Sequence, residues 1–189
     1  MTDPQATDPR TAGPQPKPRT VPVTVTWLEM DRRPDGPFAP LPMNAPVSLM
    51  RAHRPPVRWF RYLYDMVGEP YDWTDRHGDD PEALRAFVQD DDVSLFAMTY
   101  DGWAAGICML DWREEGVCDL AYFGIAEALH GRGLGRWLLG EAIRMGWGRE
   151  GTAKMTVNTC TLDHPRALGM YQRAGFAPVR RTETERQIG

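Results

Sequence analysis

The sequence predicts a three-layer α+β (α/β/α) protein, in which helices flank a mostly antiparallel sheet. Two observations carry this prediction. Three successive segments between residues 94 and 125 are apolar, strand-like and separated by tight turns. The stretch 134–147 instead repeats apolar residues at helical spacing, directly after a glycine-rich loop. A length of 189 residues fits one such domain with a tail.

The N-terminal region divides into a tail, a strand and a loop. Residues 1–20 hold five prolines among polar residues and have little apolar surface to bury, so we expect a disordered tail before a single domain spanning 21–189. Val21–Met30 alternates apolar residues with threonine and predicts a half-buried strand. Five more prolines between residues 31 and 46 predict a surface loop.

The next elements are predicted to be a strand and two helices. Val47–His53 predicts a short strand. Val57–Val67 carries its large apolar residues on one helical face and is followed by helix-stopping Gly68. Pro81–Gln89 predicts a second helix, with Asp80 as the N-cap and proline at the first position.

Three antiparallel strands should follow. Ser94–Tyr100 and Trp103–Trp112 flank an Asp-Gly pair, which favours a tight hairpin turn. A second turn at Glu114–Gly116 leads into Val117–Ile125. These strands end at the glycine-rich loop.

The C-terminal part predicts two helices and two strands. Leu134–Trp147 is a long amphipathic helix. Lys154–Cys160 reads as a strand and Pro165–Arg173 as a helix ended by a glycine. Phe176–Arg181 opens a last strand.

Composition narrows the class of partner. The net charge of −4 argues against a nucleic-acid or anionic-membrane partner. No apolar run approaches the roughly 18–20 residues of a membrane span, and the N-terminus lacks a secretory h-region. The three cysteines lack CxxC spacing and read as reduced core residues, so we expect a cytoplasmic protein without a metal site.

The glycine loop is the most informative motif. Gly131, Gly133 and Gly135 precede a helix, whose N-terminus together with such a loop suits a pyrophosphate. Alone, these glycines could equally cap a structural helix. A dinucleotide site would need a parallel strand before the loop, and a nucleoside-triphosphate loop would need Lys-Ser/Thr after it, where Arg136-Trp137 stands. Neither alternative fits.

The segment His130–Gly135 resembles the Arg/Gln-x-x-Gly-x-Gly/Ala signature of the GNAT superfamily of acyl-CoA N-acyltransferases. A second segment, with Ala167, Tyr171 and Gly175-Phe176 at family spacing, resembles its C-terminal element. The resemblance covers roughly residues 94–180, and is nearest to a bacterial subgroup without an assigned substrate. His130 replaces the usual Arg or Gln, and His164 stands where many members have Asn.

The resemblance implies a centrally splayed mixed sheet that holds acetyl-CoA between Asp119–Ile125 and Lys154–Cys160. The first of these strands would pair its backbone with pantetheine, and the glycine loop would hold the pyrophosphate. The implied acetyl-CoA-binding residues are Phe123, Gly124, Ile125, His130, Gly131, Arg132, Gly133, Leu134, Gly135, Arg136 and His164.

The resemblance also implies catalytic and acceptor residues. Tyr171 would be the general acid at the departing thiolate, or else a packed core residue. Asp119 would be the general base, unless it is a satisfied structural carboxylate, and His164 is the other candidate for this role. Tyr64, Trp73 and Arg76 would line the acceptor site, although aromatic residues there could equally be core.

The implied activity is direct transfer of an acetyl group from acetyl-CoA to a primary amine on a small molecule, peptide or protein. A catalytically silent acyl-CoA-binding module is the main alternative, and a structural or nucleic-acid-binding domain is a third. A homodimer is one assembly open to the chain.

Overall fold

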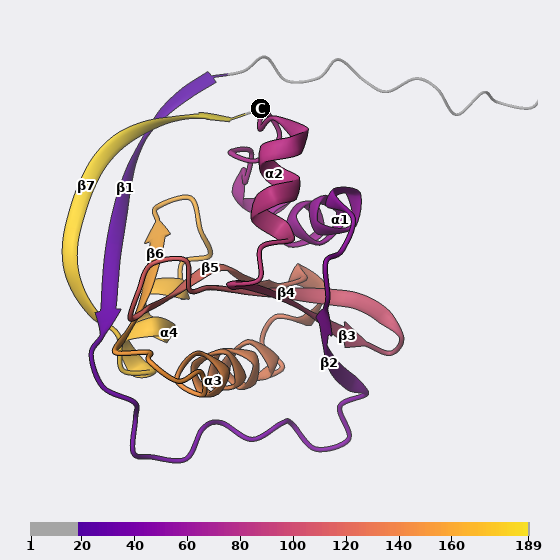
Figure 1. Cartoon of the computed structure of the whole chain (residues 1–189), viewed down its shortest axis with the longest axis vertical. Coiled ribbons are helices and arrows are strands. Elements are labelled where there is room, and N and C mark those ends of the chain that lie inside the picture. The colour runs from indigo at the N-terminus through magenta and orange to yellow at the C-terminus, as the bar shows by residue number, and fades with distance from the viewer. Residues whose placement is uncertain (1–18, 189) are drawn as a thin grey trace, which may run out of the picture.

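The computed structural model describes residues 19–188, in which seven strands form one mixed sheet (Figure 1). Their spatial order is β2-β3-β4-β5-β6-β1-β7. The strands are β1 Arg19–Met30, β2 Val47–Ala52, β3 Val93–Tyr100, β4 Trp103–Asp111, β5 Val117–Ile125, β6 Lys154–Cys160 and β7 Ala177–Ile188. The helices are α1 Val57–Gly68, α2 Pro81–Val88, α3 Leu134–Gly146 and α4 Ala167–Arg173, with short 3-10 turns at Glu69–Tyr71 and Glu127–Leu129.

Helices cover both faces of the sheet, which confirms the predicted three-layer α+β architecture. Helices α1 and α2 lie on one face, and α3 and α4 lie on the other (Figure 1). Successive side chains of β4 point to opposite faces of the sheet, so Ile107 packs toward α1 and α2 while Cys108 packs toward α3. We call these two faces the α1–α2 face and the α3–α4 face.

The sheet opens at its centre. All neighbouring strands are antiparallel except β5 and β6, which are parallel and pair over three positions only, from Val117 with Lys154 to Asp119 with Thr156. Beyond Asp119 the two strands separate. The backbone of β5 from Leu120 to Ile125 therefore has β4 on one side and no strand on the other.

Three predicted boundaries differ from those of the structure by two residues or more. Residues 19 and 20 belong to β1, where Arg19 pairs with Ile188, so the domain begins before residue 21; the rest of the predicted tail lies outside the described residues. Helix α4 begins at Ala167, because the residues after His164 form a turn. Strand β7 extends to Ile188, because pairing with β1 alone holds it and its charged, mostly exposed side chains give no apolar alternation.

The described cysteines are free thiols: Cys108 and Cys118 are buried, and Cys160 is partly exposed. Within residues 19–188 no helix is long and apolar enough to cross a membrane. The same residues contain no group of three or more His, Cys, Asp and Glu side chains placed to hold a metal ion.

An alanine at Gly124 is expected to destabilise the fold, because its Cβ would lie 2.4 Å from Val67 Cγ1 of α1. Overpacking of this kind costs about 1–3 kcal/mol. Gly78→Ala is the matched control, since a Cβ there meets nothing within 4 Å. Urea unfolding of the two variants measures the difference. Equal stabilities would contradict the close packing of α1 on β5.

Candidate active site

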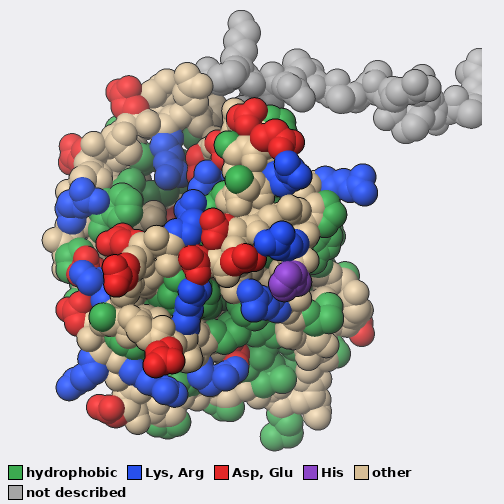
Figure 2. Space-filling model, viewed as in Figure 1, with side chains coloured by type: hydrophobic (Ala, Val, Ile, Leu, Met, Phe, Trp, Pro, Cys, Tyr) green, Lys and Arg blue, Asp and Glu red, His purple; other side chains and the backbone are tan. Residues whose placement is uncertain are grey.

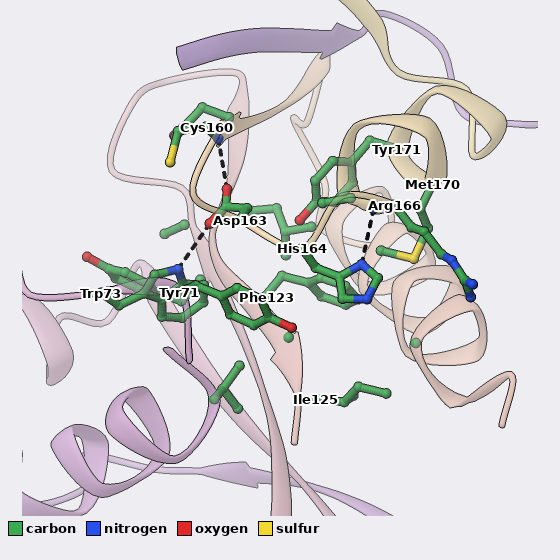
Figure 3. Close-up of a pocket in the computed structure, with 18 of the residues that line it drawn as sticks. Tyr71, Trp73, Phe123, Ile125, Cys160, Asp163, His164, Arg166, Met170 and Tyr171 are labelled. Atoms are coloured by element: carbon green, nitrogen blue, oxygen red, sulfur yellow. Dashed lines mark hydrogen bonds between the residues drawn. The ribbon is translucent and has the colours of Figure 1, made fainter. Parts of the chain in front are cut away.

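A cavity of about 750 Å³ lies where β5 and β6 separate. It is lined from both faces of the sheet (Figure 3). Phe123 and Tyr171 belong to the core on the α3–α4 face, whereas Tyr122 packs against the core on the α1–α2 face. The opening therefore connects the two faces, and a donor and an acceptor can approach each other through it.

Tyr171 comes from α4 and is only 5% exposed. Its ring packs edge-on against Phe123 and Phe176, each with a centroid distance of 6.1 Å. The hydroxyl points into the cavity (Figure 3) and has no hydrogen-bond partner among the described residues. Burial, and then the negative charge of Asp163, raises the pKa of Tyr171 far above its usual value. The phenol therefore stays protonated and can donate.

Asp119 lies at the last paired position between β5 and β6 and lines the same cavity. The Thr156 hydroxyl donates a hydrogen bond of 2.6 Å to Asp119 Oδ1. Burial raises the pKa of Asp119 to about 6, with smaller contributions from Asp111 and Glu114, while the Thr156 bond opposes the rise. Asp119 is thus ionised at neutral pH, yet it accepts a proton more readily than an ordinary aspartate.

The glycine loop forms the N-terminus of α3. Gly131 and Gly133 adopt φ values of 77° and 80°, which side chains rarely tolerate. Gly133 caps the helix, so the N–H groups of the first turn lack intrahelical partners. Gly135 and Arg136 line the cavity. Free N–H groups, the helix dipole and an arginine suit the pyrophosphate of a coenzyme A thioester.

Two histidines lie beside this loop. A ring nitrogen of His130 is 3.2 Å from the carbonyl oxygen of Ile125, and its ring stacks edge-on against His164 at 4.9 Å. The Arg166 N–H donates to His164 Nδ1 at 3.1 Å. Burial, His130 and Arg166 lower the pKa of His164, which favours a neutral ring. The Ile125 carbonyl predicted to bind pantetheine is therefore already contacted by His130.

Three predicted contacts need correction. Tyr64 is fully buried and donates to Asp75 Oδ1 at 2.7 Å, so its ring is core and does not reach the cavity. Arg132 does not line the cavity, and it donates to the Tyr100 hydroxyl at 3.2 Å. The Leu134 side chain is buried in the core, which leaves only its backbone N–H for a phosphate.

Trp73 and Arg76 do line the cavity, on the loop between α1 and α2. Trp73 Nε1 donates to Asp163 at 3.1 Å and ties this loop to the end of β6. Asp163 also accepts from the Cys160 N–H at 2.8 Å (Figure 3). The Thr159 hydroxyl donates to it at 2.7 Å. The loop is therefore held over the opening in the sheet.

The structure brings further polar side chains to the cavity, beyond the predicted site residues, and seven of them bear on the chemistry. They are Asp75, Asp111, Arg113, Tyr122, Asp163, Arg166 and Arg186. A hairpin alignment across the turn at Glu114–Gly116 would have found one of them, because Asp111 lies directly opposite Asp119. Arg186 carried no such signal, because its strand was not expected to extend that far.

The splayed sheet, the glycine loop and the tyrosine of α4 define a protein with the fold of the acyl-CoA N-acyltransferases. A family model described as the acetyltransferase (GNAT) family matches residues 60–176. The chain therefore belongs to the GNAT acetyltransferase family. No curated protein sequence matches the chain.

Solved structures share the fold at low identity. A GCN5-related N-acetyltransferase from Sphaerobacter thermophilus has a TM-score of 0.63 at 16% identity, over 90% of this chain and 53% of that one. A functionally unknown conserved protein from Staphylococcus epidermidis has a TM-score of 0.53 at 12% identity, over 89% and 62%. This chain thus spans little more than half the length of these two proteins.

A third similar structure is an aminoglycoside acetyltransferase from an uncultured soil metagenomic sample, in complex with sisomicin. Its TM-score is 0.55 at 13% identity, over 68% of this chain and 87% of that one. At such identities the likeness concerns the fold alone.

Proposed function

We propose that the chain is an N-acetyltransferase that moves an acetyl group directly from acetyl-CoA to a primary amine of a small molecule or protein. One observation carries the proposal: Tyr171 and Asp119 line one cavity from opposite faces of the opening in the sheet. A donor bound along α3 and an acceptor bound under α1 and α2 would meet between a proton donor and a proton acceptor.

The glycine loop and the edge of β5 would hold acetyl-CoA, which supplies an activated thioester. Arg136 and Arg166 line the cavity near the N-terminus of α3, where forked guanidinium donors suit phosphate oxygens. The backbone of β5 beyond Asp119 is unpaired on its β6 side and can bind an extended amide-bearing chain.

Asp119 and Tyr171 would handle the protons. Asp119 accepts a proton from the acceptor amine, directly or through water, so that the nitrogen lone pair can attack the thioester carbonyl carbon. A C–N bond forms and the C–S bond breaks. Tyr171 O–H donates to the departing sulfur as negative charge develops on it.

The main alternative is a silent acyl-CoA-binding domain that acts as a sensor or partner module. Tyr171 favours the enzyme, since its hydroxyl points into the cavity, has no partner among residues 19–188 and adds nothing to the packing of the ring. Free cysteines and an acetyl-CoA cosubstrate fit a cytoplasmic protein.

Acetyl-CoA is expected to raise the melting temperature of the protein. Binding at 100 times the Kd contributes about 2.7 kcal/mol. Arg136→Gln should shrink the shift, whereas Arg144→Gln should not, because Arg144 pairs with Glu141 on α3 away from the cavity. Thiol release with a panel of primary amines separates the alternatives. A shift without thiol release would support the silent module, and no shift would contradict both readings.

A further inference from the structure

Three arginines from distant parts of the chain converge on the acceptor side of the cavity. Arg76 lies on the loop between α1 and α2, Arg113 follows β4, and Arg186 lies on β7. Figure 2 shows Lys and Arg side chains, with Asp and Glu side chains beside them, along a hollow between the β1–β7 pair and helices α1 and α2. This end of the cavity is distinct from the glycine loop, which lies on the α3–α4 side.

Each arginine keeps hydrogen-bond donors for a ligand. Arg113 uses Nε and Nη2 on Asp111. Arg76 uses Nε on the Tyr122 hydroxyl at 2.5 Å and Nη1 on Asp79 at 2.9 Å. Their remaining guanidinium nitrogens have no partner among residues 19–188, and Arg186 forms no hydrogen bond or ion pair within that part of the chain.

The carboxylates on the cavity wall are already occupied. Asp75 accepts from the hydroxyls of Tyr64 and Tyr122, at 2.7 and 3.4 Å. Asp111 is held by Arg113, and Asp163 accepts from Trp73. Asp119, like Asp75, accepts only from neutral hydroxyls, and with a single such bond it remains available to an amine. Of the three arginines, Arg186 is the one without a carboxylate partner among residues 19–188.

The arginines also lie close to the reacting end of the cavity. Asp111, which holds Arg113, is directly opposite Asp119 in the β4–β5 register. The guanidinium carbons of Arg76 and Arg113 lie 4.9 and 4.5 Å from the centroid of the same ring, that of Phe87. An amine at Asp119 thus has guanidinium donors one strand away.

The third arginine is brought to the same end by a contact between the loop and β7. The Thr74 hydroxyl donates to the carbonyl of Gln187 at 3.3 Å, which sets the residue after Arg186 beside the loop that carries Arg76. Val25 and Trp27 of β1 line the floor on this side. The acceptor site therefore combines guanidinium groups with an apolar wall.

We propose that the acceptor is a small amine with a carboxylate close to its nitrogen, of the amino-acid class, and that Arg186, Arg113 and Arg76 bind this carboxylate. The inference rests on the proposed acetyltransferase function and names its substrate class.

The test compares acceptors that differ only in charge. L-Phenylalanine, L-methionine and L-tryptophan are each assayed against their own amides, with spermidine as a polycation. At least one acid should show a kcat/KM at least 10-fold above that of its amide. Arg186→Gln should abolish most of this preference, by raising KM for the acid far more than KM for the amide. Arg181→Gln is the matched control, because Arg181 lies on β7 outside the cavity.

A binding experiment tests the carboxylate site without requiring turnover. Calorimetry with CoA-saturated protein should detect at least one of the three amino acids, with at least 10-fold weaker binding to the Arg186→Gln variant and unchanged binding to the Arg181→Gln variant. The carboxylate site would be overturned if the amides or spermidine were acetylated as efficiently as the acids. It would also be overturned if none of the amino acids bound. Absence of thiol release with every amine, despite amino-acid binding, would instead overturn the acetyltransferase function and leave the carboxylate site standing.

Discussion

Replacing Tyr171 with phenylalanine is expected to lower kcat by about 100- to 10 000-fold, the range typical of a lost proton donor. The ring would keep its packing against Phe123 and Phe176, so the fold and the KM for acetyl-CoA should change little. Only the O–H that we propose as the proton donor to the departing sulfur is removed. Steady-state kinetics with saturating acetyl-CoA measures the effect.

Tyr62→Phe is the matched control for Tyr171→Phe, because Tyr62 is 53% exposed on α1 and does not line the cavity. It should keep the wild-type rate. The raised pKa of Tyr171 adds a second expectation, since the phenol should not ionise within the assay range and its loss of a proton should not limit activity up to about pH 10. Full turnover by Tyr171→Phe would show that Tyr171 is only a packing residue.

Activity is expected to fall as the pH drops below about 6, because the buried Asp119 carboxyl has its pKa raised to about 6 and a protonated carboxyl cannot accept the amine proton. Asp119→Asn should lower kcat by at least about 100-fold and remove this acidic limb. The measurement is a pH profile of kcat for both proteins. An unchanged limb in the variant would assign it to another group.

Asp119→Asn should also change the free energy of unfolding. An increase would indicate that the buried Asp119 carboxyl is charged in the folded protein. The pKa of Asp119 is higher in the folded than in the unfolded chain, so its ionisation opposes folding above pH 6 and this penalty fades as the pH falls through 6 toward 4. The variant should therefore gain about 1–3 kcal/mol at pH 8 and almost nothing at pH 4. The Asn amide oxygen can still accept from Thr156, which preserves the local hydrogen bond.

Much of the fold could be predicted because local sequence patterns match the strands and helices that the folded chain forms. The Asp101-Gly102 turn fixed the β3–β4 hairpin, and the helical spacing that starts at Leu134 fixed α3. The end of β7 could not be predicted, since an edge strand with charged side chains has no apolar period. Its length depends on the partner strand β1, which is a contact between distant parts of the chain.

The candidate site residues also divide into those that local motifs predict and those that only contacts between distant parts of the chain bring together. Tyr171 and the glycines belong to short motifs, so sequence spacing brought them to notice. The direction of a side chain depends on tertiary packing, which short motifs do not reveal. In the folded chain Tyr64 is buried in the core and Arg132 contacts Tyr100. The acceptor arginines come from three distant elements, so only the folded chain brings Arg186 beside the other two.

The most direct test of the account follows an isotopically labelled acetyl group by mass spectrometry. Cys160 lines the cavity and offers the obvious alternative of a covalent acetyl-enzyme. Direct transfer predicts that the protein mass stays unchanged when labelled acetyl-CoA is mixed with it alone, and that the label appears on the amine in step with thiol release once an amine is added. A protein that acquires the label and passes it on to the amine, or an amine that never acquires it, would contradict the account.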